Sequence, residues 1–153
     1  MDTYHFQYCP KLIILSADRS QVLLCKRKGE ADYDGTFSFI GGKMETTDSS
    51  IEEGIKREKD EEVGGDFKVL FYPTFSLNIL FRKKDGNAMI VPHYLAIYKE
   101  GEISLNADEY SEYRWVPIID LESFEPKIQN IPEMTRRILH LAQVLNQKDL
   151  IVI

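Results

Sequence analysis

Residues 41–64 read GGKMETTDSSIEEGIKREKDEEVG, and this stretch predicts a loop followed by an acidic helix. Ser50 is a good N-cap residue, and Glu53 three positions later completes a capping box. Gly64 suits the position just after the end of a helix. At the usual rise per residue, the helix between these signals is about 20 Å long.

Three carboxylates of this predicted helix lie close together. Glu58 and Glu62 are four residues apart and Glu61 lies between them, so all three fall within an arc of roughly 100°. Like charges this close repel each other and lower stability. A divalent cation would offset that cost, because Mg²⁺ prefers hard oxygen ligands such as carboxylates and substrate phosphate oxygens.

A solvated helix face is the simpler interpretation of such an acidic run. Two neighbouring features favour a metal site instead. Arg57 is four residues before Glu61 and can orient that carboxylate through a forked hydrogen bond. Gly41 and Gly42 allow the backbone to turn sharply or to approach a ligand closely.

The same stretch resembles the Nudix box of the Nudix hydrolases, written G-x5-E-x7-R-E-U-x-E-E-x-G-U with U an apolar residue. The GGK at 41–43 matches the common opening of that motif. The segment YDGTFSFIGGKM at 33–44 resembles the usual lead-in, and EYRWVPIIDL at 112–121 resembles the segment after the metal-site loop. Five further residues match in order and spacing, namely Arg57, Glu58, Glu61, Glu62 and Gly64.

The loop of the box departs from the motif in length. One residue too many lies between Gly42 and Arg57. Aligning Ser50 with the family's usual helix cap places this extra residue in the loop before Ser50 and leaves the carboxylate register unchanged. The first Glu of the motif has no clean match, so Asp48 or Ser49 must stand in its place.

The two apolar positions of the motif are occupied by Lys59 and Gly65. A lysine stem can cover apolar surface, so we expect the Lys59 stem to do so while its ammonium group reaches water. These departures affect the anchoring of Arg57 more than they affect the metal ligands.

The resemblance implies a metal site on the helix. Glu58 and Glu62 are expected to hold Mg²⁺ or Mn²⁺, with Glu61 as a further ligand or a base. The backbone carbonyls of Gly41 and Gly42 are candidates to complete the shell. Arg57 is expected to position a carboxylate, so the candidate catalytic residues are Arg57, Glu58 and Glu61.

Many family members supply one more metal-binding glutamate from a loop after the central strands. Asp108, Glu109 and Glu112 are the candidates in this chain, and Glu109 is preferred. A solvated acidic loop is the alternative for all three.

Basic and aromatic residues supply the candidates for substrate binding. Lys26, Arg27 and Lys28 end a predicted strand just before the loop that leads to the box, where they either solubilise the strand end or clamp phosphate. Lys26, Arg27 and Lys43 form the predicted substrate-binding set. Four aromatic residues are candidates to stack on a base, although packing is the simpler role for each: Tyr72, Phe75, Tyr94 and Tyr98.

Hydrophobic patterns predict a β-rich domain with two main helices. Strands are expected at 11–17, 21–26, 36–40, 67–72, 74–81, 88–98 and 114–116, with a tight turn at 84–87. Pro132 suits the first turn of the last helix. The fold class is therefore α/β, an α/β/α sandwich around a mixed β-sheet in one domain over 1–153, and the resemblance implies the Nudix fold.

Charge and composition limit the kinds of binding partner and the cellular compartment that we expect. The net charge of −6 argues against a nucleic-acid backbone, which needs a basic surface. Residues 1–10 lack the pattern of a secretory signal, and no apolar run reaches membrane length. Cys9 and Cys25 are expected to be reduced and structural, so the cytoplasm is the expected compartment. The oligomeric state stays open, with a homodimer as one option.

The resemblance predicts a metal-dependent hydrolase that cleaves a pyrophosphate bond in a nucleoside diphosphate linked to another group. A nucleoside triphosphate, a nucleotide sugar and a dinucleotide are the candidate small-molecule substrates. The alternative is a catalytically inactive module of the same fold that senses a nucleotide or binds a protein.

Overall fold

The computed structural model describes residues 5–153, and all statements on the fold refer to them; residues 1–4, on which part of the secretory-signal expectation falls, lie outside the described residues. The helices are α1 (Ile51–Val63) and α2 (Ile131–Val144), with short 3-10 turns at Ile118–Asp120 and Gln147–Asp149. The strands are β1 (Gln7–Tyr8), β2 (Lys11–Leu15), β3 (Gln21–Arg27), β4 (Phe37–Ser38), β5 (Ile40–Gly41), β6 (Lys68–Arg82), β7 (Ala88–Glu100), β8 (Tyr110–Pro117) and β9 (Ile151–Val152).

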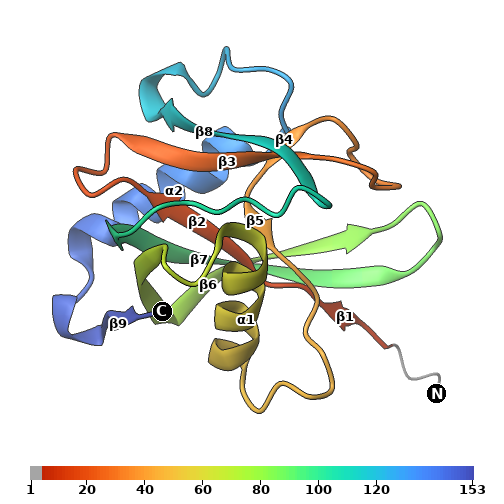
Figure 1. Cartoon of the computed structure of the whole chain (residues 1–153), viewed down its shortest axis with the longest axis horizontal. Helices are drawn as coiled ribbons and strands as arrows, with labels where there is room; N and C mark the ends of the chain where they lie inside the picture. Colours follow the sequence, from red (N-terminus) through yellow and green to blue (C-terminus); the bar gives the residue numbers. More distant parts are fainter. Residues whose placement is uncertain (1–4) are drawn as a thin grey trace.

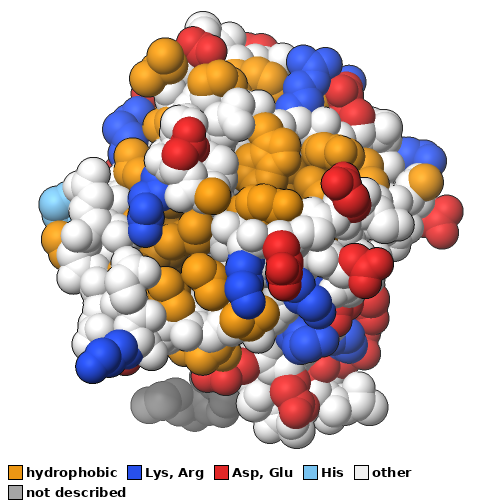
Figure 2. All heavy atoms as spheres, turned by 60° about the vertical axis from the view of Figure 1, so that its left-hand side comes forward, with side chains coloured by type: hydrophobic (Ala, Val, Ile, Leu, Met, Phe, Trp, Pro, Cys, Tyr) orange, Lys and Arg blue, Asp and Glu red, His pale blue; other side chains and the backbone are white. Residues whose placement is uncertain are grey.

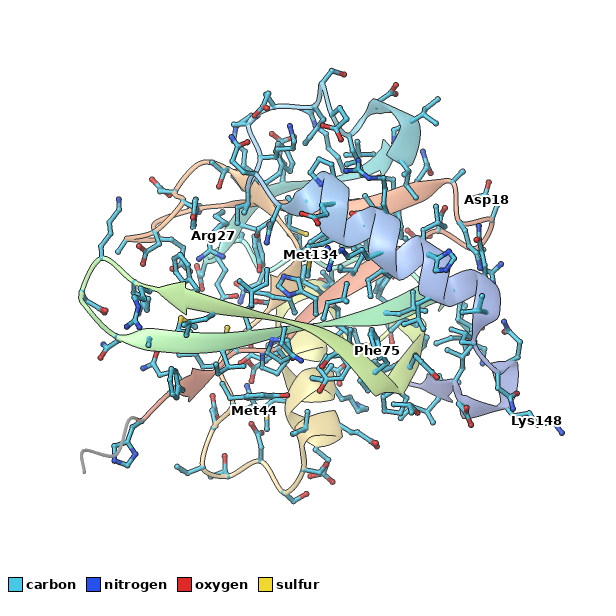
Figure 3. All side chains as sticks on the ribbon, turned by 180° about the vertical axis from the view of Figure 1, so that it is seen from behind. Asp18, Arg27, Met44, Phe75, Met134 and Lys148 are labelled. Carbon is cyan, nitrogen blue, oxygen red and sulfur yellow. The ribbon has the colours of Figure 1, made fainter. Side chains whose placement is uncertain are left out.

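These strands form one mixed sheet with a helix on each face (Figure 1). The order is β4-β3-β2-β7-β6-β9, with β1 beside β7, β5 beside β2 and β8 beside β3. The β2–β7 and β1–β7 pairs are parallel and the other pairs are antiparallel. Figure 3, seen from behind, shows α2 lying across the face opposite to α1. The predicted α/β/α sandwich around a mixed sheet is confirmed.

Strand β2 separates two hydrophobic cores. Ile13 and Leu15 pack in the core on the α2 side, where α2 contributes Met134 and Ile138 among others. Leu12 and Ile14 pack in the core on the α1 side, together with Ile55 and Val63 of α1. A strand buried on both faces reads as a continuous apolar run, and residues 12–15, Leu-Ile-Ile-Leu, are such a run.

Helix α1 begins and ends where the sequence predicts. The Ser50 side chain accepts a hydrogen bond from the Glu53 amide at 3.1 Å. The Gly64 amide donates to the Asp60 carbonyl at 3.0 Å and closes the last turn. Because both ends are capped by local contacts, the register of the acidic run follows from the local sequence.

Three strand predictions differ from the structure. The break expected at residue 73 is wrong, because β6 runs through Pro73 where the ladder with β7 is interrupted between Phe71 and Ser76. Proline lacks an amide donor and is tolerated at such an irregularity. The predicted strand at 36–40 is divided into β4 and β5, which pair with β3 and β2 respectively. Strand β8 begins at Tyr110 rather than at residue 114, because it pairs along the whole of β3.

Lys59 is fully buried, so the expectation that its ammonium group reaches water is wrong. Its Nζ donates to the carbonyl oxygen of Phe67 at 2.7 Å and lies 2.5 Å from Asp60 Oδ1. The segment after α1 folds back over the helix and supplies the Phe67 carbonyl, while Asp60 belongs to α1 itself. Together these partners make a buried lysine tolerable. Burial lowers the pKa of Lys59, and the Asp60 carboxylate opposes that shift.

The surface is mixed in charge. On the face shown in Figure 2, acidic and basic side chains are interspersed around exposed hydrophobic ones. Cys9 and Cys25 are both buried with free thiols. Within residues 5–153, no helix has the length and hydrophobicity needed to cross a membrane.

Candidate metal and substrate site

A cavity of about 760 Å³ lies between β5, α1, the β6–β7 hairpin and the loops that flank β8. Its size is in the usual range for small-molecule sites. Six acids line it, namely Glu30, Asp32, Glu45, Glu58, Glu62 and Glu109, and four cations, namely Lys11, Arg27, Lys43 and Lys83. Tyr33, Phe39, Ile79 and Phe81 contribute an aromatic and apolar wall. The cavity therefore combines acidic, basic and aromatic groups, as recognition of a nucleotide through a metal would require.

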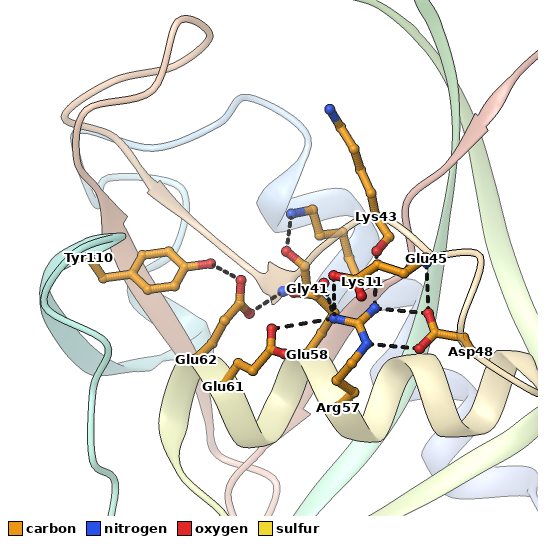
Figure 4. Close-up of polar contacts among 10 residues, drawn as sticks. All are labelled: Lys11, Gly41, Lys43, Glu45, Asp48, Arg57, Glu58, Glu61, Glu62 and Tyr110. Atoms are coloured by element: carbon orange, nitrogen blue, oxygen red, sulfur yellow. Dashed lines mark hydrogen bonds and ion pairs between the residues drawn. The ribbon is translucent and has the colours of Figure 1, made fainter.

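Arg57 organises the acidic end of this cavity (Figure 4). Its Nε and Nη2 donate to the two carboxylate oxygens of Asp48 at 2.8 and 2.9 Å. Its Nη1 donates to Glu58 Oε1 at 2.8 Å. These hydrogen bonds lower the pKa of Asp48 to about 2 and raise that of Arg57. The forked contact fixes the guanidinium, which in turn orients Glu58.

Asp48 therefore takes the place of the first Glu of the motif, a choice that the sequence left open between Asp48 and Ser49. The Ser49 hydroxyl instead donates to Glu53 on the first turn of α1. The extra residue of the loop thus lies between Asp48 and the helix cap, so the expectation that it falls before Ser50 agrees with this geometry.

Glu62 is a buried carboxylate at the centre of the site. It is 3% exposed and accepts hydrogen bonds from the Gly41 amide at 2.7 Å and the Tyr110 hydroxyl at 3.0 Å. Burial raises the pKa of Glu62 to about 8, opposed by Lys11 and the Gly41 amide. Both hydrogen-bond donors are neutral, so they stabilise the charged form less than a contacting cation would.

Glu58 lies against the backbone of Gly42. A Cβ atom added at Gly42 would be 2.2 Å from Glu58 Oε2, so a larger residue at this position would displace the carboxylate. Burial raises the pKa of Glu58, Arg57 opposes the shift, and Glu61 and Glu109 add to it. Glu109 also raises the pKa of Glu62. The preferred loop acid, Glu109, thus lines the same cavity and is close enough to raise the pKa of both helix carboxylates.

Glu61 does not line the cavity. Its side chain is 55% exposed, and its carboxylate lies 3.3 Å from Arg57 Nη1. At about 100° per residue, Glu62 is rotated by about 40° from Glu58 and Glu61 by about 60° in the opposite sense. The expected arc of three carboxylates is present, but the cavity is lined by only two of them.

Three other candidates are also outside the cavity lining. Lys26 forms an ion pair with Glu112 at 3.8 Å, and Glu112 is part of β8 rather than of the loop. Asp108 lies in the loop, where its amide donates to the Asn106 side chain at 3.0 Å. Arg27, Lys43 and Glu109 therefore have positions that support their predicted roles, whereas Lys26, Asp108 and Glu112 do not.

The aromatic candidates for base stacking are elsewhere. Tyr72 and Tyr94 pack in the two cores, and Tyr98 packs against Phe67 and Trp115. Phe75 is exposed and does not line the cavity. Instead, Tyr33 and Phe81 meet at the cavity wall with ring centroids 5.8 Å apart.

Sequence reasoning also missed Lys11, Tyr110 and Lys83 as residues of the site. Lys11 is the first residue of β2, and Tyr110 directly follows Glu109 at the start of β8. Of these three residues, only Tyr110 could have been found from the sequence, because it directly follows the candidate metal ligand Glu109.

The donor set fits a hard divalent cation shared with a substrate. Across residues 5–153, no three acidic, histidine or cysteine side chains are gathered into a ready-made metal site. Mg²⁺ does not require one, because it is commonly held by one or two carboxylates together with substrate phosphates and water. Glu58 and Glu62 supply carboxylates of this kind, and Glu109 supplies a third nearby.

Comparisons with known proteins agree with the fold. The NUDIX domain model matches residues 11–138. A 32-residue segment is 53% identical to the U8 snoRNA-decapping enzyme of Xenopus laevis, a match that spans 21% of this chain and only 15% of that enzyme.

Two solved structures share the fold over almost their whole length. The MutT protein of Methanosarcina mazei Go1 has a TM-score of 0.72 at 19% identity, covering 94% of this chain and 99% of that one. A C. elegans Ap4A hydrolase has a TM-score of 0.72 at 13% identity, covering 91% of this chain and 99% of that one.

Proposed function

Because the chain belongs to the NUDIX domain family of pyrophosphohydrolases, we propose that it cleaves a pyrophosphate bond in a nucleoside diphosphate linked to another group. The proposed cofactor is Mg²⁺ or Mn²⁺. A bound cation would neutralise charge on the phosphate oxygens of the substrate.

The observation that carries this proposal is the burial of Glu62 beside two further acids. A buried carboxylate is costly unless a cation or several hydrogen bonds compensate it. Glu62 has two neutral donors, and the nearby carboxylates of Glu58 and Glu109 add repulsion. A divalent cation at this point would remove the repulsion, which a merely solvated helix face would not need.

We assign the following roles to the residues of this chain. Glu58, Glu62 and Glu109 hold the cation, and Arg57 positions Glu58 through its anchor on Asp48. We also propose the Gly42 carbonyl as a metal ligand, since Gly42 lies against the Glu58 carboxylate. Glu61 keeps its proposed role as a further ligand or base, which the motif supports more than its exposed position does.

The basic and aromatic walls of the cavity suit the rest of a nucleotide. Arg27 and Lys43 line the cavity and are proposed to bind phosphate oxygens. Tyr33 and Phe81 offer ring surfaces to a base. The proposed substrate-binding role of Lys26 has no such support, since Lys26 pairs with Glu112.

A panel of substrates with Mg²⁺ or Mn²⁺ tests the proposal. It should contain nucleoside triphosphates, nucleotide sugars, a dinucleoside tetraphosphate and a capped RNA oligonucleotide, scored for release of phosphate or nucleoside monophosphate. The dinucleotide and the capped RNA represent the activities named for two of the similar proteins, the Ap4A hydrolase and the decapping enzyme. We expect turnover of at least one member that stops when the metal is chelated.

The rival interpretation is a module that binds a nucleotide without cleaving it. The exposure of Glu61, away from the cavity, is the observation that favours it. Nucleotide binding without metal-dependent turnover of any substrate in the panel would support this module and refute the hydrolase.

A further inference from the structure

Lys11 differs from the other cations of the cavity in what it contacts. Arg27 lies 3.3 Å from Glu30, and Lys83 lies 3.3 Å from Asp85, so each has a carboxylate partner. The Lys11 ammonium group donates instead to a neutral acceptor, the carbonyl oxygen of Gly41, at 2.9 Å. Figure 4 shows Lys11 reaching Gly41, whereas the Lys43 side chain extends away from the carboxylates.

Lys11 lies between two neighbouring strands of the sheet, β5 and β7. Lys11 is opposite Gly41 in the antiparallel β2–β5 pair and opposite His93 in the parallel β2–β7 pair. Its stem packs closely on Gly41, since a Cβ atom added there would lie 3.0 Å from Lys11 Cδ. The ammonium group is therefore aimed into the cavity by a rigid part of the fold.

Gly41 connects Lys11 to the buried acid of the site. The amide of Gly41 donates to Glu62 Oε2 at 2.7 Å, while its carbonyl accepts from Lys11. Lys11 is also the leading influence that lowers the pKa of Glu62, against the larger effect of burial. The neighbouring His93 adds no charge at neutral pH, because burial and the positive charge of Lys11 lower its pKa to about 4. Lys11 and Glu62 are thus connected through a single residue, Gly41, which places a positive charge close to the buried acid.

We propose that Lys11 is a ligand for the pyrophosphate group of the substrate and that its charge competes with the metal at Glu62. This inference rests on the proposed function. A cation bound at Glu62 would neutralise that carboxylate. The Lys11 ammonium group would then be held only by the neutral Gly41 carbonyl and could donate to a phosphate oxygen. Such a hydrogen bond between two charged groups is stronger than the one it replaces.

Two effects of opposite sign follow from this arrangement. Removing the charge of Lys11 removes a repulsion toward the metal, so metal binding becomes tighter. The same change removes a donor to the phosphate, so phosphate binding becomes weaker. A lysine with only a structural role would not separate the two affinities in this way.

The test compares Lys11→Met and Lys11→Arg with wild type by titration calorimetry. Lys99→Met is the matched control, because Lys99 is an exposed lysine in β7, outside the cavity lining. The probes are Mg²⁺ alone and then methylenediphosphonate in saturating Mg²⁺, a pyrophosphate mimic that the enzyme cannot hydrolyse. Both measurements are independent of turnover and of the identity of the base.

We expect Lys11→Met to bind Mg²⁺ about 3- to 10-fold more tightly, as loss of a nearby repulsive charge predicts. It should bind methylenediphosphonate about 10- to 100-fold more weakly, as loss of a charged hydrogen bond predicts. Lys11→Arg should stay close to wild type in both titrations, and Lys99→Met should match wild type.

Equal weakening of both probes in Lys11→Met, or no change in either, would overturn the inference about Lys11 while the proposed function stands. A wild-type protein that binds neither Mg²⁺ nor methylenediphosphonate would refute the proposed function, and the inference with it.

Discussion

Helices α1 and α2 are nearly equal in length, with 13 and 14 residues, and cover opposite faces of one sheet, but they bury different chemistry. The buried positions of α2 are apolar apart from Thr135, and include Met134, Ile138 and Ala142. Those of α1 include Lys59 and Glu62, beside Ile55 and Val63. The comparison indicates that α2 mainly stabilises the fold, whereas α1 accepts a loss of stability to hold charged groups at a cavity.

The largest expected effect is on catalysis, at the buried carboxylate of α1. Glu62→Gln keeps the shape of the side chain but removes a metal ligand. Phosphoryl chemistry depends mainly on positioning and charge stabilisation, so turnover should fall by about 10³-fold or more at fixed metal concentration. Steady-state kinetics with the best substrate of the panel measures it. Unchanged turnover would contradict the claim that α1, unlike α2, carries a carboxylate needed for catalysis.

The corresponding change in α2 should act on stability instead. Ile138 is fully buried in the core on the α2 side. Ile138→Ala should lower the free energy of unfolding by about 2–4 kcal/mol, because it removes buried methyl groups and leaves a cavity. Denaturant unfolding gives this value, and kcat of the folded protein should change less than twofold. A large loss of kcat with normal stability would contradict the division of roles.

The pH dependence of stability sharpens the comparison further. Without metal, the pKa of Glu62 is raised from 4.5 to about 8 in the folded state. A raised pKa means that the folded protein binds the proton more tightly, so this stabilisation is complete below pH 4.5 and is lost as pH rises toward 8. Relative to Glu62→Gln, metal-free wild type should lose about 3–4 kcal/mol between pH 5 and pH 8, since one pKa unit corresponds to about 1.4 kcal/mol. The free energy of unfolding is measured against pH by urea unfolding with chelator. Parallel curves for the two proteins would show that burial does not raise the pKa of Glu62.

The smallest effect is expected at the loop acid. Glu109→Gln should reduce turnover about tenfold, less than loss of a helix carboxylate, because Glu109 is exposed and adjoins the helix carboxylates from a loop. Glu112→Gln is the matched control and should retain activity, since Glu112 is in β8 and pairs with Lys26. If only the Glu112 change reduces kcat/KM, Glu112 rather than Glu109 completes the site.

The contrast also explains what could be predicted from the sequence. The start and end of α1 depend on local caps, and its carboxylate spacing is a property of any helix, so both were predictable. The side on which Glu61 lies depends on how α1 rotates against β5, which no local pattern specifies. The choice of Asp48 over Ser49 depends on the path of the loop. Lys11 and Lys59 acquire their partners from segments that meet them only in the folded chain.

The central claim is that the acids of α1 form a metal site rather than a solvated face, and the thermal response to Mg²⁺ tests it most directly. A ligand that binds only the folded state raises the melting temperature by mass action. Wild type, measured with chelator and then with excess Mg²⁺, should show a clear increase in Tm, and Glu62→Gln should show a much smaller one. Equal Mg²⁺-induced shifts in the two proteins would contradict the claim and leave these carboxylates as surface charge.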